Sequence, residues 1–143
     1  MTLQRDSRVV SVEDYARLLS FYAVQSHAID EGDAERWADS FTPDGAFDSP
    51  TYEVPVTGRE NLIAFARSIS VANEGRTQRH HLNSLIAEHR GSDVISAQAY
   101  ILIVVTQPTQ PPVVARSVKI DDDLRLTQNG WRIARRITHV DGL

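Results

Sequence analysis

The sequence predicts an α+β fold in which three N-terminal helices pack on a strongly curved, mostly antiparallel sheet. Two observations carry this prediction: helical periodicity dominates the first half of the chain, and long alternating strands fill the second. Three helices can cover only one face of such a sheet, so we expect the sheet to curl around a pocket. A length of 143 residues, 41% of them hydrophobic, fits one domain spanning residues 1–143.

The first helix has a clear beginning and end. Ser11 followed by Asp14 resembles a capping box, and apolar residues then recur at spacings of three and four as far as Asp30. Gly32 is a residue typical of a helix C-terminus, and Asp33 can cap a second helix. Residues before this segment read as an N-terminal arm over 1–10.

Shorter elements follow. Trp37 marks the apolar face of the second helix, and Thr42–Gly45 has the composition of a type I turn. A short strand fits residues 46–48. Thr57 and Glu60 then resemble a second capping box, which predicts a third helix behind them.

The second half of the chain reads as four strands. They cover residues 76–88, 94–106 and 113–126, and the last one follows the Gln128–Gly130 turn, in which Asn-Gly is a strong hairpin signal. The run 94–106 is apolar at both odd and even positions, so we expect both of its faces to be covered.

Composition excludes several classes of function. A net charge of −4 disfavours a nucleic-acid partner, and no apolar run approaches the ~20 residues that span a membrane. The absence of cysteine rules out disulfides, thiolate metal sites and a cysteine nucleophile, and is compatible with a cytoplasmic location. Residues 1–10 lack the apolar core of a signal peptide. No pattern calls for a cofactor or metal.

Asp30 and His80 are the leading candidates for chemistry. A carboxylate on an otherwise apolar helix face and a histidine early in a strand can together transfer a proton, with Asp30 orienting His80 as general base. Tyr22, on the same helix side, could donate a hydrogen bond to a developing enolate. The alternatives are a solvated acid at a helix end, a surface histidine and a core tyrosine.

Three further residues are candidates for the pocket. Strand parity does not decide whether His80 or His81 points inward, so His81 stays a candidate for substrate binding, together with Tyr52 and Arg116. Adjacent strand residues point to opposite faces, which argues against a metal site made by the two histidines. Arg116 and Asp122 occupy the apolar parity of their strand, which indicates an ion pair, a pocket anchor or a β-bulge.

Five segments in this order resemble the SnoaL-like proteins of the nuclear transport factor 2 superfamily. They are Asp30–Asp33, Trp37–Gly45, Thr57–Glu60, His80 and Gly130–Ile133. The resemblance implies a cone-shaped α+β barrel around one deep pocket, often in a homodimer. Members of the superfamily include polyketide cyclases, dehydratases, ketosteroid isomerase and proteins without known activity, so fold alone does not fix function.

The resemblance extends to two single residues. Asp30 matches an aspartate that the dehydratases carry at the end of helix one, and His80 matches a histidine in their first long strand. The second histidine of scytalone dehydratase has no match between Val113 and Thr127. Asp48 lies one residue before the place of the isomerase's acid–proline step.

Together these features predict an enzyme that needs no cofactor. It would use Asp30 and His80 to abstract a proton from a hydrophobic small molecule that is polyketide-, terpenoid- or steroid-like, giving dehydration, isomerisation or cyclisation. The alternative is a domain of the same fold that only binds a small ligand or assists assembly. The resemblance and the apolar run 95–105 suggest a homodimer, although that run could equally pack within its own chain.

Overall fold

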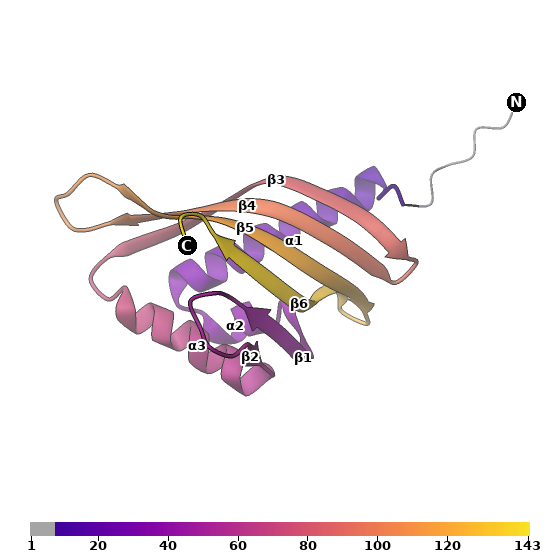
Figure 1. The fold of residues 1–143 in the computed structure, drawn as a ribbon, viewed down its shortest axis with the longest axis horizontal. Helices are drawn as coiled ribbons and strands as arrows, with labels where there is room; N and C mark the ends of the chain where they lie inside the picture. Colours follow the sequence, from indigo (N-terminus) through magenta and orange to yellow (C-terminus); the bar gives the residue numbers. More distant parts are fainter. Residues whose placement is uncertain (1–7) are drawn as a thin grey trace, which may run out of the picture.

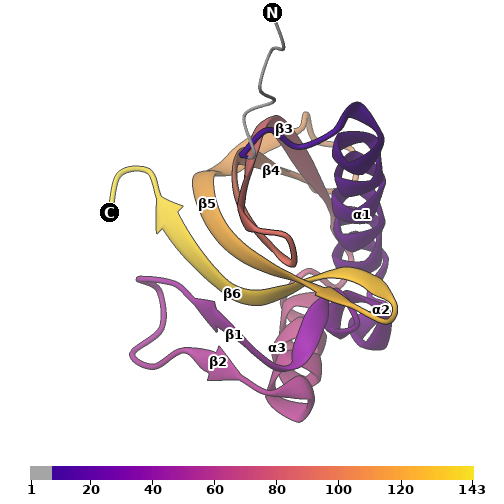
Figure 2. The ribbon, with the colours of Figure 1, turned by 90° about the vertical axis from the view of Figure 1, so that its right-hand side faces the viewer.

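The structure, a computed structural model, describes residues 8–143. Its six-stranded sheet has the order β2-β1-β6-β5-β4-β3. The sheet bends so that α1 and α3 lie on its inner side (Figure 1, Figure 2). The elements are α1 (Val12–Glu31), α2 (Ala34–Ala38), β1 (Phe41–Asp48), β2 (Val56–Thr57), α3 (Arg59–Ala72), β3 (Thr77–Gly91), β4 (Val94–Thr106), β5 (Val113–Thr127) and β6 (Gly130–Val140).

The predicted α+β class is confirmed, with one difference in the sheet. Strands β3 to β6 form an antiparallel meander, and β1 pairs with β6 in parallel. The sheet is open rather than closed into a barrel, because β2 and β3 are edge strands. Of the predicted arm 1–10, residues 1–7 lie outside the described part of the chain, and Val9 forms a bridge with Glu88 at the free edge of β3.

The predicted ends of α1 are confirmed. Ser11 caps the helix by accepting a hydrogen bond from the Asp14 N–H at 3.1 Å, and Gly32 ends it in the left-handed conformation at φ 77°. Asp33 then caps α2 by accepting from the Arg36 N–H at 3.2 Å. These two adjacent caps fix where α1 stops, and therefore where Asp30 lies.

The predicted capping box before α3 is wrong. The N-cap is Gly58, at φ 86°, and no side chain caps this helix. Glycine adopts that left-handed φ without steric cost, whereas a side chain there would be strained. Thr57 consequently lies one residue outside the cap, where it belongs to β2.

The predicted turn at Thr42–Gly45 is also wrong, because this segment lies inside β1. The register of β1 on β6 shifts between Phe41 and Ala46, so the extra residues form an irregularity within the strand. The Gly45 carbonyl accepts the Gly58 N–H at 2.9 Å, across to the start of α3. The residue types typical of a turn thus form an irregularity within β1, where it pairs with β6.

The expectation that both faces of β4 are covered is wrong for the single chain. Ile95, Ala97 and Ala99 are buried on the inner face, but Tyr100 and Leu102 on the outer face are 54% and 38% exposed. The reason is topological: an open sheet with all helices on one side leaves its outer face bare. No helix within residues 8–143 is long and apolar enough to cross a membrane.

Candidate functional site

A cavity of about 360 Å³ lies between the helices and the inner face of the sheet. One wall is aromatic: Trp37, Phe47, Tyr52 and Phe65 line it, with the rings of Phe47 and Phe65 5.0 Å apart and those of Trp37 and Phe65 5.5 Å apart. The position expected for Tyr52, beside the cavity, is the one observed. Aliphatic side chains form a further part of the wall, namely Ile29, Ile69, Ile101, Ile103, Val105, Val118, Ile120 and Val140.

Asp30 and His80 meet at the edge of this cavity. Asp30 Oδ1 lies 2.6 Å from His80 Nδ1, and Asp30 Oδ2 accepts the main-chain N–H of His80 at 2.9 Å. The side chains are only 12% and 17% exposed. An ionised carboxylate can only accept, so in the neutral imidazole Nδ1 carries the proton and Nε2 keeps a lone pair. His80 lines the cavity, and no residue of the described chain is bonded to its Nε2.

The alternation of β3 separates the two adjacent histidines. His80 faces the cavity, whereas His81 points to the outer face, is exposed and pairs with the outward-facing Leu102 of β4. His81 does not line the cavity, so the structure does not place it where the predicted substrate contact requires. The sequence alone left this choice open because apolar residues occur at both parities of the strand.

Arg116 faces the cavity by the regular alternation of β5, and a β-bulge lies next to it at Ala115. Ile103 of β4 pairs with Arg116, but the next residue, Val104, pairs with Val114, which leaves Ala115 as an extra residue. Ala115 and Arg116 consequently both line the cavity. Arg116 is exposed at its edge, and no partner for its guanidinium is found among the described residues.

His80 and Arg116 belong to one row across the sheet. His80 pairs with Ile103, and Ile103 pairs with Arg116. With neighbouring strands about 4.8 Å apart, the two outer residues of this row are separated by about 10 Å between their Cα atoms. The cavity edge therefore carries an imidazole and a guanidinium from two strands that flank β4.

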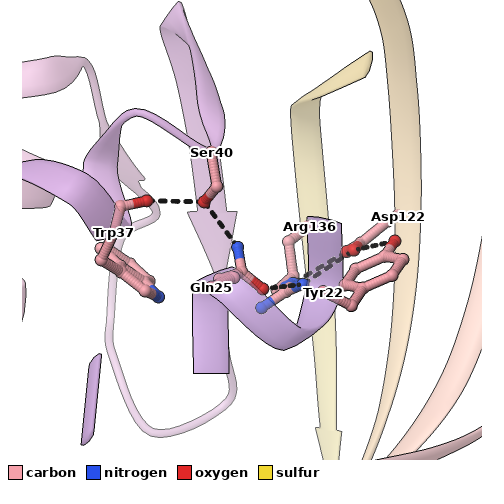
Figure 3. A network of polar contacts seen from close by, with 6 residues as sticks. All are labelled: Tyr22, Gln25, Trp37, Ser40, Asp122 and Arg136. Atoms are coloured by element: carbon pink, nitrogen blue, oxygen red, sulfur yellow. Dashed lines mark hydrogen bonds and ion pairs between the residues drawn. The ribbon is translucent and has the colours of Figure 1, made fainter. Parts of the chain in front are cut away.

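Tyr22 lies outside the cavity lining. Its side chain is buried, and its hydroxyl donates to Asp122 Oδ2 at 2.7 Å (Figure 3). Burial and the neighbouring Asp122 carboxylate raise the pKa of Tyr22 well above its ordinary value, so the hydroxyl stays protonated. This position does not bring Tyr22 to the enolate oxygen that the sequence-based hypothesis assigned to it.

Asp122 belongs to a buried ion pair with Arg136. The carboxylate accepts from Arg136 Nε and Nη2, each at 2.8 Å. Burial by itself lowers the pKa of Arg136, but the Asp122 carboxylate outweighs burial and raises it overall. Of the three possibilities that the sequence left for Asp122, an ion pair is the one observed, although its partner is Arg136 and not Arg116.

The ion pair continues into a chain of hydrogen bonds. Arg136 Nη2 donates to Gln25 Oε1 at 2.8 Å, Gln25 Nε2 donates to Ser40 Oγ at 2.7 Å, and Ser40 Oγ donates to the Trp37 carbonyl (Figure 3). Gln25, Arg136 and Thr138 are buried polar residues that line the cavity, and we term them the cavity floor. Sequence reasoning missed all three.

One signal could have pointed to Arg136. A charged Asp122 on the buried parity of its strand demands a cation on a neighbouring strand. The register of β5 on β6 shifts between Asp123 and Leu124, which makes Ala134 an extra residue and turns Arg136 inward. Strict alternation from Trp131 would have turned Arg136 outward, so the bulge had to be known first.

The site has no arrangement suited to a metal ion. Within residues 8–143 there is no cluster of three or more histidine, cysteine, aspartate or glutamate side chains able to hold one. The polar side chains that line the cavity include the imidazole of His80, the exposed guanidinium groups of Arg76 and Arg116, and several hydrogen-bonding groups.

A comparison with known protein families matches residues 10–137 of this chain to the SnoaL-like domain. The structure of Aln2 from a Streptomyces species is 25% identical and superposes with a TM-score of 0.87, covering 94% of this chain and 95% of that one. A protein from Catenulispora acidiphila, solved in complex with S-DNPA, is 30% identical, with a TM-score of 0.79 and coverage of 92% and 96%. ActVI-ORFA from Streptomyces coelicolor, 23% identical, shares the fold at a TM-score of 0.84, with coverage of 92% and 100%. A comparison with curated protein sequences finds no match.

Proposed function

Because the chain belongs to the SnoaL-like family, we propose that it is an enzyme that abstracts a proton next to a carbonyl group of a hydrophobic small molecule, without a cofactor. The observation that carries the proposal is the contact between Asp30 and a cavity-lining His80 whose Nε2 is left unpartnered among the described residues. A histidine held in one tautomer by a carboxylate is suited to act as a general base near neutral pH.

In this mechanism the proton moves from carbon to His80 Nε2, and the C–H electron pair forms an enolate. Asp30 stabilises the imidazolium that results, as the acid of a catalytic triad does. Return of the proton from His80 Nε2 to another carbon gives isomerisation. Its transfer to a β-hydroxyl, which leaves as water while the enolate collapses to the unsaturated ketone, gives dehydration. Attack of the enolate carbon on a second carbonyl gives cyclisation.

The cavity supports a hydrophobic substrate of modest size. Its volume of about 360 Å³ lies at the small end of ligand pockets, which suits a molecule of two or three fused rings. The aromatic wall, Tyr52 included, can stack on such rings. Arg116 at the exposed edge would hold a polar or anionic substituent. A polyketide- or terpenoid-like substrate has these properties.

The test follows deuterium into the α-position of 1-tetralone, a bicyclic ketone, by NMR in deuterated water. We expect the wild-type protein to accelerate exchange, and His80→Ala to lose at least about 100-fold of that acceleration, since general bases contribute 10²–10⁴-fold. His81→Ala is the matched control, because that side chain lies exposed on the outer face. Full exchange in a correctly folded His80→Ala variant would refute the proposal.

The same experiment recognises the alternative, a domain that only binds its ligand. The relative solved with S-DNPA shows that a protein of this similarity can hold a small molecule. In that case 1-tetralone binds without exchange, and its affinity survives removal of the Asp30 and His80 side chains. Binding together with exchange that depends on His80 excludes this alternative.

The exposed outer face supports a homodimer as part of the proposal. Ile86, Tyr100 and Leu102 leave apolar surface there, 62%, 54% and 38% exposed. Two copies pairing through this face would cover it. Sedimentation that gives only monomer at micromolar concentration would refute the dimer, and Tyr100→Lys should dissociate it if it forms.

A further inference from the structure

We infer that Arg136 and Thr138 form an oxygen-binding subsite on the cavity floor, which holds a neutral carbonyl oxygen of the substrate. This inference deepens the proposed function, on which it rests for the reacting molecule. The binding that it requires can be measured without any reaction. It assigns to the cavity floor the contact with the substrate oxygen that the sequence alone suggested for Tyr22.

Thr138 supplies the first observation. It lines the cavity and is 8% exposed, yet its hydroxyl has no hydrogen-bond partner among the described residues. Buried hydroxyls are normally satisfied, because an unmade hydrogen bond costs about 1–3 kcal/mol. In the inferred subsite, a ligand group that enters the cavity lined by Thr138 completes this hydroxyl.

Arg136 supplies the second observation. Its Nε and Nη2 are engaged by Asp122 and Gln25, whereas no acceptor within the described chain is found for Nη1 (Figure 3). A guanidinium carries two N–H donors on Nη1. Because Arg136 lines the cavity, these donors are available to a ligand, and the three bonds on the other nitrogens hold the group rigidly in place.

The two side chains face the same way. Arg136 and Thr138 are two residues apart on β6, so they rise from the same face of the strand about 7 Å apart. A carbonyl oxygen has two lone pairs and can accept from both. Donors fixed before the substrate arrives stabilise charge that develops on that oxygen, as in an oxyanion hole.

The charges around this subsite favour a neutral oxygen. The Arg136 charge is already balanced by Asp122, which lies buried beside it with a fully buried side chain. A carboxylate entering the cavity floor would add a second negative charge in a place with little water, which is costly. An anion loses less hydration at the exposed Arg116. We therefore expect a carboxylate of the ligand to bind at Arg116 and a ketone oxygen to bind at Arg136.

The experiment compares two probes of nearly equal shape, 1-tetralone and its hydrocarbon tetralin, by chemical-shift titration of the protein amides. We expect the wild type to bind the ketone about tenfold more tightly, as one or two neutral hydrogen bonds allow. Thr138→Val replaces the hydroxyl by a methyl group of the same shape. It should bring the ratio of the two affinities down at least threefold while tetralin binds as before.

Two further variants sharpen the result. Thr138→Ser keeps the hydroxyl and should keep the wild-type ratio of affinities. Arg136→Lys keeps a cation for Asp122 but removes the Nη1 donors, so in a folded sample it should also lower the ratio. With 1-tetralone labelled with ¹³C at the carbonyl, the bound resonance should move downfield in the wild type and less so in Thr138→Val.

The inference is overturned if the wild type binds the ketone no more tightly than tetralin, including the case in which it binds neither. It is also overturned if Thr138→Val keeps the wild-type ratio. The exchange assay separates the two proposals. If exchange depends on His80 but Thr138→Val keeps the wild-type ratio of ketone to tetralin affinities, the proposed function stands and the subsite is refuted. If Thr138→Val lowers that ratio but the wild-type protein does not catalyse exchange, the subsite stands and the proposed function is refuted.

Discussion

Asp30 is joined to His80 at two points, since one carboxylate oxygen meets ring Nδ1 at 2.6 Å and the other accepts the main-chain N–H at 2.9 Å. The second bond ties the carboxylate to the backbone of β3, so the imidazole is oriented relative to the strand as well as to the acid. The end of α1 and the start of β3 are thereby held together at the cavity edge.

Asp30→Asn should remove activity with little loss of fold. An amide can donate to Nδ1, which would move the proton to Nε2 and leave the ring without a lone pair toward the cavity. We expect a fall of about 10²–10⁴-fold in α-proton exchange, the range in which a misplaced tautomer acts. NMR exchange rates together with an unchanged amide spectrum would check this.

The double variant Asp30→Asn, His80→Ala provides the control for that prediction. Residues that act as one unit show strongly non-additive losses, so the double variant should be no slower than His80→Ala alone. If the loss of exchange rate in the double variant equals the product of the losses in the two single variants, Asp30 acts separately from His80.

Asp122→Ala should destabilise the protein by about 3–5 kcal/mol, because it leaves the Arg136 cation buried without its partner. Asp121→Ala is the matched control on the adjacent residue. Asp121 is partly exposed and contacts Gln98 and His139 at the surface, so its loss should cost less than about 1 kcal/mol. Urea denaturation measures both, and equal losses would contradict the account of the buried pair.

Tyr22 should make stability fall at alkaline pH. Above a pH of about 10 an unfolded chain loses the phenolic proton, whereas the raised pKa of Tyr22 keeps it bound in the folded protein. The folded state then binds more protons than the unfolded state, so the free energy of unfolding decreases as pH rises. Tyr22→Phe should show a shallower decrease in denaturation experiments across this range.

The same substitution has a cost at neutral pH. Tyr22→Phe removes a hydrogen bond to a charged acceptor, and we expect a loss of about 1.5–3 kcal/mol. Activity should change little, because Tyr22 does not line the cavity. A large loss of exchange at unchanged stability would restore the catalytic role that the sequence suggested.

Thr138→Val should raise the melting temperature. It replaces a buried, unpartnered hydroxyl by a methyl group in the middle of a strand, where valine is favoured. Functional positions commonly carry such a stability cost. Calorimetry that finds Thr138→Val less stable than the wild type would indicate that the hydroxyl has a partner after all.

Features encoded by neighbouring residues were predictable from sequence. The caps of α1 at Ser11 and Gly32 depend on a few adjacent positions, and they fixed where the helix ends. An aspartate on the last turn of an apolar helix face was for that reason recognisable as unusual. Its meeting with His80 could be hypothesised from the resemblance, but the distance depended on the packing of α1 against β3.

Features that depend on strand register were not predictable. The bulge at Ala134 shifts the alternation of β6 by one residue, which decides that Arg136 and Thr138 face inward. A bulge is stabilised by bonds to a partner strand, and no local pattern reports it. For the same reason Arg136 and Thr138 escaped notice while Tyr22, on a regular helix, drew attention.

Helix α1 carries one residue from each polar centre of the cavity, Gln25 beside Arg136 and Asp30 beside His80. With a rise of 1.5 Å per residue, the five steps from Gln25 to Asp30 span about 7.5 Å along the axis. The helix therefore fixes the distance between the two polar centres. Substitutions in the aliphatic wall would change which molecules fit the cavity. The distance between the two polar groups that such a molecule must present would stay the same, because α1 fixes it. A one-residue insertion before Asp30 would rotate its side chain by about 100° around the helix axis and so remove the fixed spacing.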